Sequence, residues 1–259
     1  MKKKRLKILL GILSVVFFCW GCRALANFLD PVGIKGRPDE VVLRDEYYAM
    51  DSQTILADVI KNKPVQLNLV PEPAEILPSA PPVVPWTQAD YLQIANAVFF
   101  TVWKDSAVNW KLDEIYAETN CAGIGLGFQT MSFDFFRVKR SADGYFHTQR
   151  RIYINPEKKL IWVLETKTSP VRSWGWGAID ADKIIPAEEA LKIAEENGGS
   201  QARYNNIIEC DIAVKISAGD NWRVSYWQAL YDRNQDFFFM EVDERTGQVV
   251  SKWSEPPAP

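Results

Sequence analysis

Apolar positions recur every three to four residues between positions 91 and 103, which predicts an amphipathic helix. Its apolar side consists of Tyr91, Ala95, Val98, Phe99, Val102 and Trp103. Thr87 stands at the expected N-cap, and Asp90, three positions later, completes a capping-box pair. Trp86 and Tyr91 occupy the apolar positions that pack across such a helix start. We therefore expect a helix over about 88–104.

Downstream of this helix, apolar and polar residues alternate, as they do in strands with one buried face. Residues 124–128 alternate apolar side chains with glycines, so we expect a strand that another backbone can approach closely. The pattern changes parity near Gln129, which predicts a bulge or a strand break. Two further strands are expected over 146–154 and 160–166.

The order of a helix followed by strands returns in the C-terminal part. Pro186 suits the first turn of a helix, and the pair Gly198-Gly199 is expected to end it. Four strands should follow, over 208–216, 222–230, 237–243 and 248–253. Runs of strands after a helix are typical of α+β folds, in which a helix packs on an antiparallel sheet. The chain is therefore predicted to contain two tandem units of this kind, 86–170 and 182–254.

Seven prolines lie between positions 64 and 85. This density disfavours a regular helix or a central strand and favours extended polyproline conformation. We interpret residues 23–85 as a membrane-proximal region that ends in a semi-rigid, proline-rich linker.

Basic residues at positions 2–7 precede an apolar run over 8–22, the pattern of a secretory signal or a membrane anchor. Positive charge at the start of such a segment keeps that end in the cytoplasm, which places the globular part outside. Residues 1–22 are therefore assigned to a signal or N-terminal membrane-anchor helix.

Three fates of this segment fit the sequence. Gly21-Cys22 resembles a bacterial lipobox, which makes Cys22 a candidate lipidation site of a lipoprotein. Residues 24–26 (Ala-Leu-Ala) fit ordinary signal cleavage after Ala26, and the third fate is an uncleaved helix. Two of the three tether the protein to the cell membrane, so an anchored, extracytoplasmic protein is favoured over a secreted one.

Charge argues against a nucleic-acid partner. The formal net charge is −3, and the first seven residues carry five of the cations. Without those five, 25 basic residues stand against 33 acidic ones. An acidic body is repelled by phosphate backbones.

Cys121 and Cys210 leave two alternatives open. Outside the cytoplasm they can form a disulfide, but free cysteines are also common as small buried residues. Cys210 is expected to lie on the apolar face of its strand, and this position suits either alternative.

The sequence contains no recognisable catalytic or metal motif. His147 is the only histidine, so zinc motifs built on paired histidines are excluded, and the sequence has neither a G-x-S-x-G nor a phosphate-binding loop. We therefore expect no catalytic residue, metal or cofactor.

Trp174 and Trp176 lie between the two expected units. They either pack the units together or form a platform for a peptide or sugar, and packing is favoured.

Three blocks, 184–194, 222–226 and 241–250, resemble the PepSY family: a helix rich in Glu and Ala, a Trp-x-Val strand and a closing Val-Asp-x-x-Thr-Gly-x-Val hairpin. The resemblance covers 182–254, and 86–170 is similar to a degenerate second copy that lacks the Thr-Gly turn. It implies a cystatin-like helix on a sheet and a non-catalytic role, binding or restraining a peptidase or peptide. The alternatives are a structural envelope protein without a ligand groove and, less favoured, a hydrolase of envelope polymers. The hydrolase would need Asp180 or Asp182 to converge with a second carboxylate.

Overall fold

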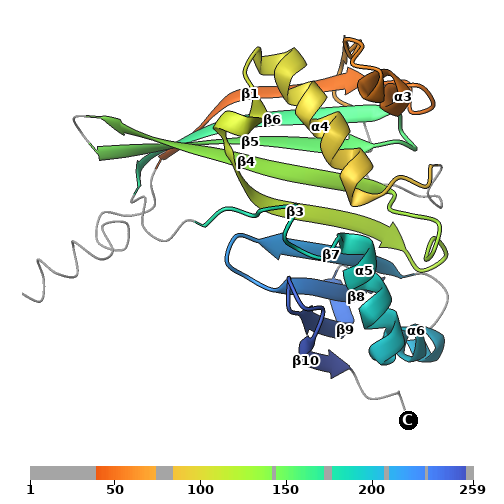
Figure 1. Cartoon of the computed structure of the whole chain (residues 1–259). Coiled ribbons are helices and arrows are strands. Elements are labelled where there is room, and N and C mark those ends of the chain that lie inside the picture. Colours follow the sequence, from red (N-terminus) through yellow and green to blue (C-terminus); the bar gives the residue numbers. More distant parts are fainter. Residues whose placement is uncertain are drawn as a thin grey trace, which may run out of the picture. The chain divides into compact units, whose positions relative to one another are not determined.

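The structure is a computed structural model that describes residues 39–73, 84–141, 144–171, 177–206, 210–230 and 233–254 (Figure 1). The candidate lipidation site Cys22 and the tryptophans Trp174 and Trp176 lie outside these residues, as does the predicted N-terminal helix. In the part of the chain that is described, no helix combines the length and the apolar character needed to cross a bilayer.

The chain divides into two compact units. The smaller comprises residues 1–41, 138–147 and 168–174, and the larger comprises 42–137, 148–167 and 175–259. Both expected helix-and-strand segments have their helices and most of their strands in the larger unit.

The chain has a mixed α+β fold in which the sheet predominates. The ten strands lie in the order β10-β9-β8-β7-β3-β4-β5-β6-β1-β2. They are β1 (Asp39–Ala49), β2 (Asn68–Val70), β3 (Lys111–Asn120), β4 (Thr130–Ser141), β5 (Gly144–Asn155), β6 (Leu160–Val171), β7 (Asp211–Ser217), β8 (Trp222–Leu230), β9 (Arg233–Val242) and β10 (Val249–Ser254). Strands of both expected units belong to this one sheet, because β3 pairs antiparallel with β7 from Glu114↔Ser217 to Asn120↔Asp211.

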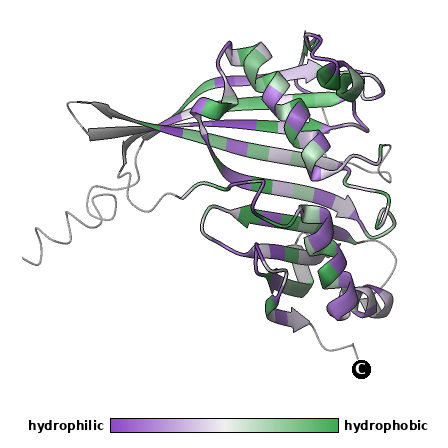
Figure 2. Ribbon diagram, viewed as in Figure 1, coloured by the Kyte–Doolittle hydropathy of each residue, from purple (hydrophilic) through white to green (hydrophobic). Residues whose placement is uncertain are grey.

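The helices lie in front of the sheet in Figure 1 and share one apolar core with its facing side. They are α3 (Ile55–Ile60), α4 (Gln88–Trp103), the 3-10 turn η1 (Ala107–Asn109), α5 (Ala187–Ala194), the connecting segment η2 (Glu195–Gly199) and α6 (Ser200–Asn206). Apolar and polar stretches alternate along the strands in Figure 2, and the apolar residues of β7, Ile212, Val214 and Ile216, are buried. The period-two pattern thus separates the core face of the sheet from its other face.

The start of α4 is as predicted. The Thr87 side chain accepts from the Asp90 N–H, and the Asp90 carboxylate accepts from the Thr87 N–H at 2.9 Å, which completes the capping box. The Trp86 and Tyr91 rings meet edge to face with centroids 5.3 Å apart. Lys104, with φ 52°, is the C-cap, so the helix ends where the pattern predicts.

The strand predicted over 124–128 is wrong: residues 121–129 form a loop, and β4 begins only at Thr130. Gly125 and Gly127 have φ values of +82° and +113°, a conformation outside the β region that L side chains rarely adopt. The glycines therefore serve a turn rather than a smooth strand face. Because no strand directly precedes Gln129, the bulge or strand break predicted there is not found, and β4 begins one residue later.

Gly198-Gly199 ends the second helix, as predicted. Asn197 (φ −105°, ψ 20°) and Gly198 (φ +125°) have non-helical dihedrals, which end the helix at this point. A separate helix, α6, then begins at Ser200.

The region assigned to the membrane-proximal linker contributes structure of its own. Residues 39–73 form β1, α3 and β2, and β1 and β2 pair antiparallel at one end of the strand order. Residues 74–83, with three of the seven prolines, lie outside the described residues.

Candidate functional site

A groove of about 480 Å³ lies between α5 and the loop 121–129, in the larger unit. We call it the helix–loop groove. Its lining residues are Pro85, Trp86, Thr87, Ile124, Gly125, Leu126, Gly127, Phe128, Glu188, Leu191, Lys192 and Glu195. The groove is therefore bounded by the start of α4 and the loop 121–129 on one side and by the exposed side of α5 on the other.

The loop wall of this groove is apolar. Leu126 is 51% exposed at its rim, whereas Phe128 is buried at its base. The Tyr91 hydroxyl donates to the Phe128 carbonyl oxygen at 2.8 Å, which fixes the end of the loop to α4. A Cβ on Gly127 would lie 3.3 Å from the Val84 carbonyl oxygen, so the loop packs closely on the segment before α4.

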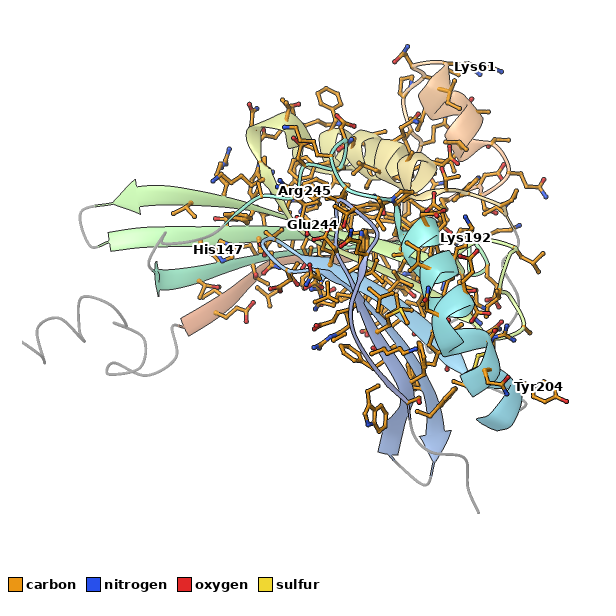
Figure 3. The ribbon with its side chains drawn as sticks, turned by 60° about the horizontal axis from the view of Figure 1, so that its bottom comes forward. Lys61, His147, Lys192, Tyr204, Glu244 and Arg245 are labelled. Atoms are coloured by element: carbon orange, nitrogen blue, oxygen red, sulfur yellow. A yellow bond between two sulfur atoms is a disulfide. The ribbon has the colours of Figure 1, made fainter. Side chains whose placement is uncertain are left out.

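The α5 wall combines a buried apolar residue, Leu191, with charged neighbours. Lys192, labelled in Figure 3, is exposed and pairs with Glu189 at 3.2 Å. The groove is thus apolar on the loop side and charged along α5.

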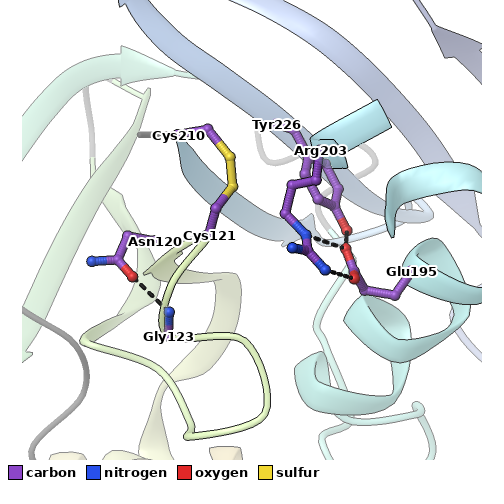
Figure 4. The surroundings of a disulfide bond; sticks show 7 residues. All are labelled: Asn120, Cys121, Gly123, Glu195, Arg203, Cys210 and Tyr226. Carbon is purple, nitrogen blue, oxygen red and sulfur yellow. Dashed lines mark hydrogen bonds and ion pairs between the residues drawn. A yellow bond between two sulfur atoms is a disulfide. The ribbon is translucent and has the colours of Figure 1, made fainter. Parts of the chain in front are cut away.

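A disulfide joins Cys121 to Cys210 at the start of the loop (Figure 4). The two Cα atoms are 5.3 Å apart, and the Cys121 N–H donates to the Cys210 carbonyl oxygen at 2.8 Å. The Asn120 side-chain oxygen then accepts from the Gly123 N–H at 2.7 Å. Of the two alternatives for these cysteines, the structure contains the disulfide, and it anchors the loop wall to the start of β7.

Glu195 lies where α5 passes into η2, and its carboxylate is held by two partners (Figure 4). Tyr226 donates to it at 2.6 Å, and Arg203 forms an ion pair with it at 2.6 Å. Burial raises the pKa of the Tyr226 hydroxyl, and the neighbouring Glu195 raises it further. This contact fixes the far end of the α5 wall and offers no nucleophile at neutral pH, since the hydroxyl stays protonated.

The starts of α4 and α5 cap each other. The Gln88 side-chain oxygen accepts from the Ala187 N–H at 2.9 Å, and the Glu188 carboxylate accepts from the Gln88 N–H at 3.4 Å. Pro186, the N-cap of α5, makes no side-chain cap of its own, so Gln88 supplies it. The two helix starts beside the groove are therefore fixed to one another.

A second groove, of about 580 Å³, lies along the exposed side of α4. Leu92, Asn96 and Phe100 line it from the helix, and Ala178, Ile179 and Ala181, which precede α5, line it from the other side. In each groove the exposed side of one helix thus faces the segment that leads into the other helix.

The residues weighed for catalysis do not assemble. Asp180 is exposed and forms an ion pair with Lys183 at 2.7 Å. Among the described residues, no group of three or more histidines, cysteines or carboxylates could hold a metal ion. Burial lowers the pKa of His147, the only histidine.

Comparison with known proteins adds no relative: no family model, no curated protein and no solved structure matches the chain.

The groove was not predicted from the sequence. The glycines of 123–127 did carry a signal for the loop that forms one wall of the groove, because glycines suit a turn as well as a strand face. Taken as turn residues, they would have indicated a loop after β3.

Proposed function

We propose that this chain is a membrane-tethered, extracytoplasmic, non-catalytic binding module that holds an apolar peptide segment in the helix–loop groove. The observation that carries the proposal is the groove itself, with an apolar loop wall and an exposed Leu126 at its rim. Apolar clefts with a few polar groups at their edges are the usual form of ligand sites in proteins. A peptide of a peptidase or its substrate has the required chemistry.

We further propose that residues 86–170 and 182–254 are two copies of one PepSY-like unit. Each contains a helix followed by four strands: α4 with β3–β6, and α5 with β7–β10. In the strand order β10-β9-β8-β7-β3-β4-β5-β6, corresponding strands lie at equal positions on either side of the antiparallel β3–β7 pair. Two copies related by a local two-fold axis would have this arrangement.

The disulfide supports the proposed compartment. Disulfides persist in oxidising environments outside the cytoplasm and are rare within it. The basic start and apolar run of residues 2–22 favour the same location.

Binding of short synthetic peptides of graded apolar content, measured by calorimetry, tests the proposal. We expect apolar peptides to bind and polar peptides of the same length not to bind. Leu126→Glu places a charge at the groove rim and should weaken this binding roughly tenfold or more, because a carboxylate loses its hydration there. Val250→Glu is the matched control, since Val250 is 53% exposed on β10 and does not line the groove.

Equal binding of apolar and polar peptides, or an equal effect of the two variants, would contradict the groove assignment. A second measurement adds secreted peptidases to the protein and follows their activity. Inhibition that Leu126→Glu relieves would identify a peptidase as the source of the peptide.

A further inference from the structure

Two helices of the larger unit, α4 and α5, differ in their outer surfaces. α5 is the shorter helix and carries three charged residues, Glu188, Glu189 and Lys192. α4 is twice as long, yet residues 91–103 contain no charged residue at all. A surface helix normally places charged side chains toward solvent, because these are the side chains that stay hydrated. The outer side of α4 therefore lacks the composition of a helix surface that remains in contact with water.

Large apolar side chains are exposed on this side of α4 and on the turn that follows it. Phe100 is 61% exposed, and Val108 of η1 is 86% exposed. Together with Leu92 and Asn96 they line the groove of about 580 Å³ along α4. We call these four residues the α4 face. Single exposed apolar residues are ordinary on a protein surface, whereas several of them around one hollow are typical of an interface.

The rest of the groove lining is held in place by hydrogen bonds. The Ile179 N–H donates to the Leu112 carbonyl oxygen at 2.8 Å, which fixes the segment before α5 to β3. Trp110, which also lines the groove, is buried, and its indole N–H donates to Asp105 at 3.0 Å. Lys111 is the one charged residue of the lining. The groove is thus a preformed and largely apolar hollow.

Charged residues occur only toward the two ends of α4. Asp90 lies in the first turn of the helix, and Lys104, its C-cap, is exposed. Leu92 and Phe100 lie about one helical turn before and after Asn96, which stands near the middle of the helix. The outer side of α4 is therefore neutral at its centre and carries opposite charges at its two ends.

A second copy of this chain has the surface that fits this arrangement. If two α4 helices packed antiparallel about a two-fold axis near Asn96, residues before Asn96 in one copy would meet residues after it in the other. Phe100 of each copy would then lie against Leu92 of the other and enter its groove. Asp90 of each copy would lie near Lys104 of the other. The positive N-terminal end of each helix would also lie beside the negative C-terminal end of the other helix.

We propose that the α4 face joins two copies of this chain in a two-fold symmetric dimer, with Asn96 near the axis. An amide side chain both donates and accepts, so the two Asn96 side chains satisfy one another. No like charges meet at the centre of the contact, although each chain carries a net charge of −3. An apolar peptide or a lipid surface would leave the opposite charges at the two helix ends unmatched. The inference does not depend on the helix–loop groove, whose charged wall is α5.

The oligomeric state of the whole chain tests the proposal. We expect sedimentation velocity to show an equilibrium between monomer and dimer that shifts toward the dimer as the protein concentration increases. Phe100→Glu places a charge inside the proposed contact and should weaken self-association roughly tenfold or more, because the carboxylate loses its hydration there. Val250→Glu is the matched control. Val250 is 53% exposed on β10, outside the α4 face, so this variant should leave self-association nearly unchanged.

A second measurement locates the contact. Asn96→Cys should form a disulfide between two copies when copper–phenanthroline is added as the oxidant, because a residue near a two-fold axis faces itself in the other copy. The product is a dimer in denaturing electrophoresis without reductant. Val250→Cys is the control and should cross-link no more than the wild type.

A monomer at every concentration would overturn the proposal, and so would equal weakening of the dimer by Phe100→Glu and Val250→Glu or equal cross-linking of the two cysteine variants. A monomer that binds an apolar peptide, with binding lost in Phe100→Glu, would replace the dimer contact by a peptide site. The dimer should persist in Leu126→Glu, and apolar-peptide binding in the helix–loop groove should persist in Phe100→Glu. These two results distinguish a failure of one proposal from a failure of the other.

Discussion

The Gln88 side-chain oxygen lies 2.9 Å from the Ala187 backbone nitrogen, so the first residue of α4 caps the first turn of α5. Gln88 is 4% exposed, and therefore the Ala187 N–H has no access to water as a replacement partner. A helix start that depends on a residue 99 positions earlier connects the stability of the two halves of the chain.

We expect Gln88→Ala to lower the free energy of unfolding by about 1–2 kcal/mol, because it leaves a buried N–H without an acceptor. Gln93→Ala is the control: it removes the same side chain from an exposed position of α4 and should change stability by less than about 0.5 kcal/mol. Urea denaturation followed by tryptophan fluorescence measures both. Similar effects of the two substitutions would show that the cap does not contribute.

Gly199 is a second position of close packing, because it lies against Tyr226 of β8 and the end of α5. A Cβ there would lie 2.5 Å from the Tyr226 hydroxyl oxygen and 2.9 Å from the Ala194 carbonyl oxygen. We expect Gly199→Ala to destabilise the protein by about 1–3 kcal/mol through this overlap. Gly177→Ala, whose Cβ would have no neighbour closer than 3.7 Å, is the control and should be close to neutral in thermal denaturation.

The Cys121–Cys210 disulfide closes a long stretch of chain, since the two residues are 89 positions apart. In the chain-entropy description such a loop contributes about 4.6 kcal/mol by restricting the unfolded state. Reduction by dithiothreitol should lower the urea midpoint accordingly and increase hydrogen exchange in the loop 121–129. The double variant Cys121→Ser/Cys210→Ser should have the same lowered urea midpoint whether or not dithiothreitol is present. A midpoint of the double variant that still changes with dithiothreitol would contradict the stabilising role of this disulfide.

The Asp105 carboxylate determines part of the loss of folding stability at acid pH. Hydrogen bonds, first from the Trp110 indole N–H at 3.0 Å, lower its pKa to about 2. A carboxylate with a lowered pKa stabilises the folded state above its unfolded pKa, and this contribution is lost as pH falls through the folded value. We expect Asp105→Asn to lower the free energy of unfolding by about 1 kcal/mol at pH 7, a value that takes the partial exposure of the side chain into account. The difference in stability between wild type and variant should disappear between about pH 4 and pH 2.

Denaturation of both proteins at several pH values measures this difference. Asp182→Asn, which removes a carboxylate from an exposed position, is the control. A constant difference between wild type and Asp105→Asn down to pH 2 would contradict the assigned role.

Local features of the fold could be predicted from the sequence. The capping box of Thr87 and Asp90 follows from neighbouring residues, and the hairpin of β5 and β6 follows from alternation around a turn. Such signals depend on contacts within a few positions along the chain, where sequence spacing and spatial distance agree.

The prediction of a strand over 124–128 failed because glycine has two uses. The glycines of 123–127 suit a strand packed against another backbone, and they equally suit a loop with positive φ, which the structure contains. Only the packing of distant segments decides between such uses, as the contact of Gly127 with Val84 illustrates.

The site depended on long-range relationships that no local pattern contains. Neither the reciprocal caps of α4 and α5 nor the pairing of β3 with β7 leaves a periodic signal, because each joins residues about 100 positions apart. The helix–loop groove is formed by these same contacts.

The ladder between β3 and β7 has a consequence for the chain's integrity. Because these strands are paired along seven positions, separate pieces carrying β3 and β7 would each present an unpaired strand edge complementary to the other. We expect a chain cleaved between β6 and α5 to remain a two-piece complex, and polypeptides made separately to reconstitute it on mixing.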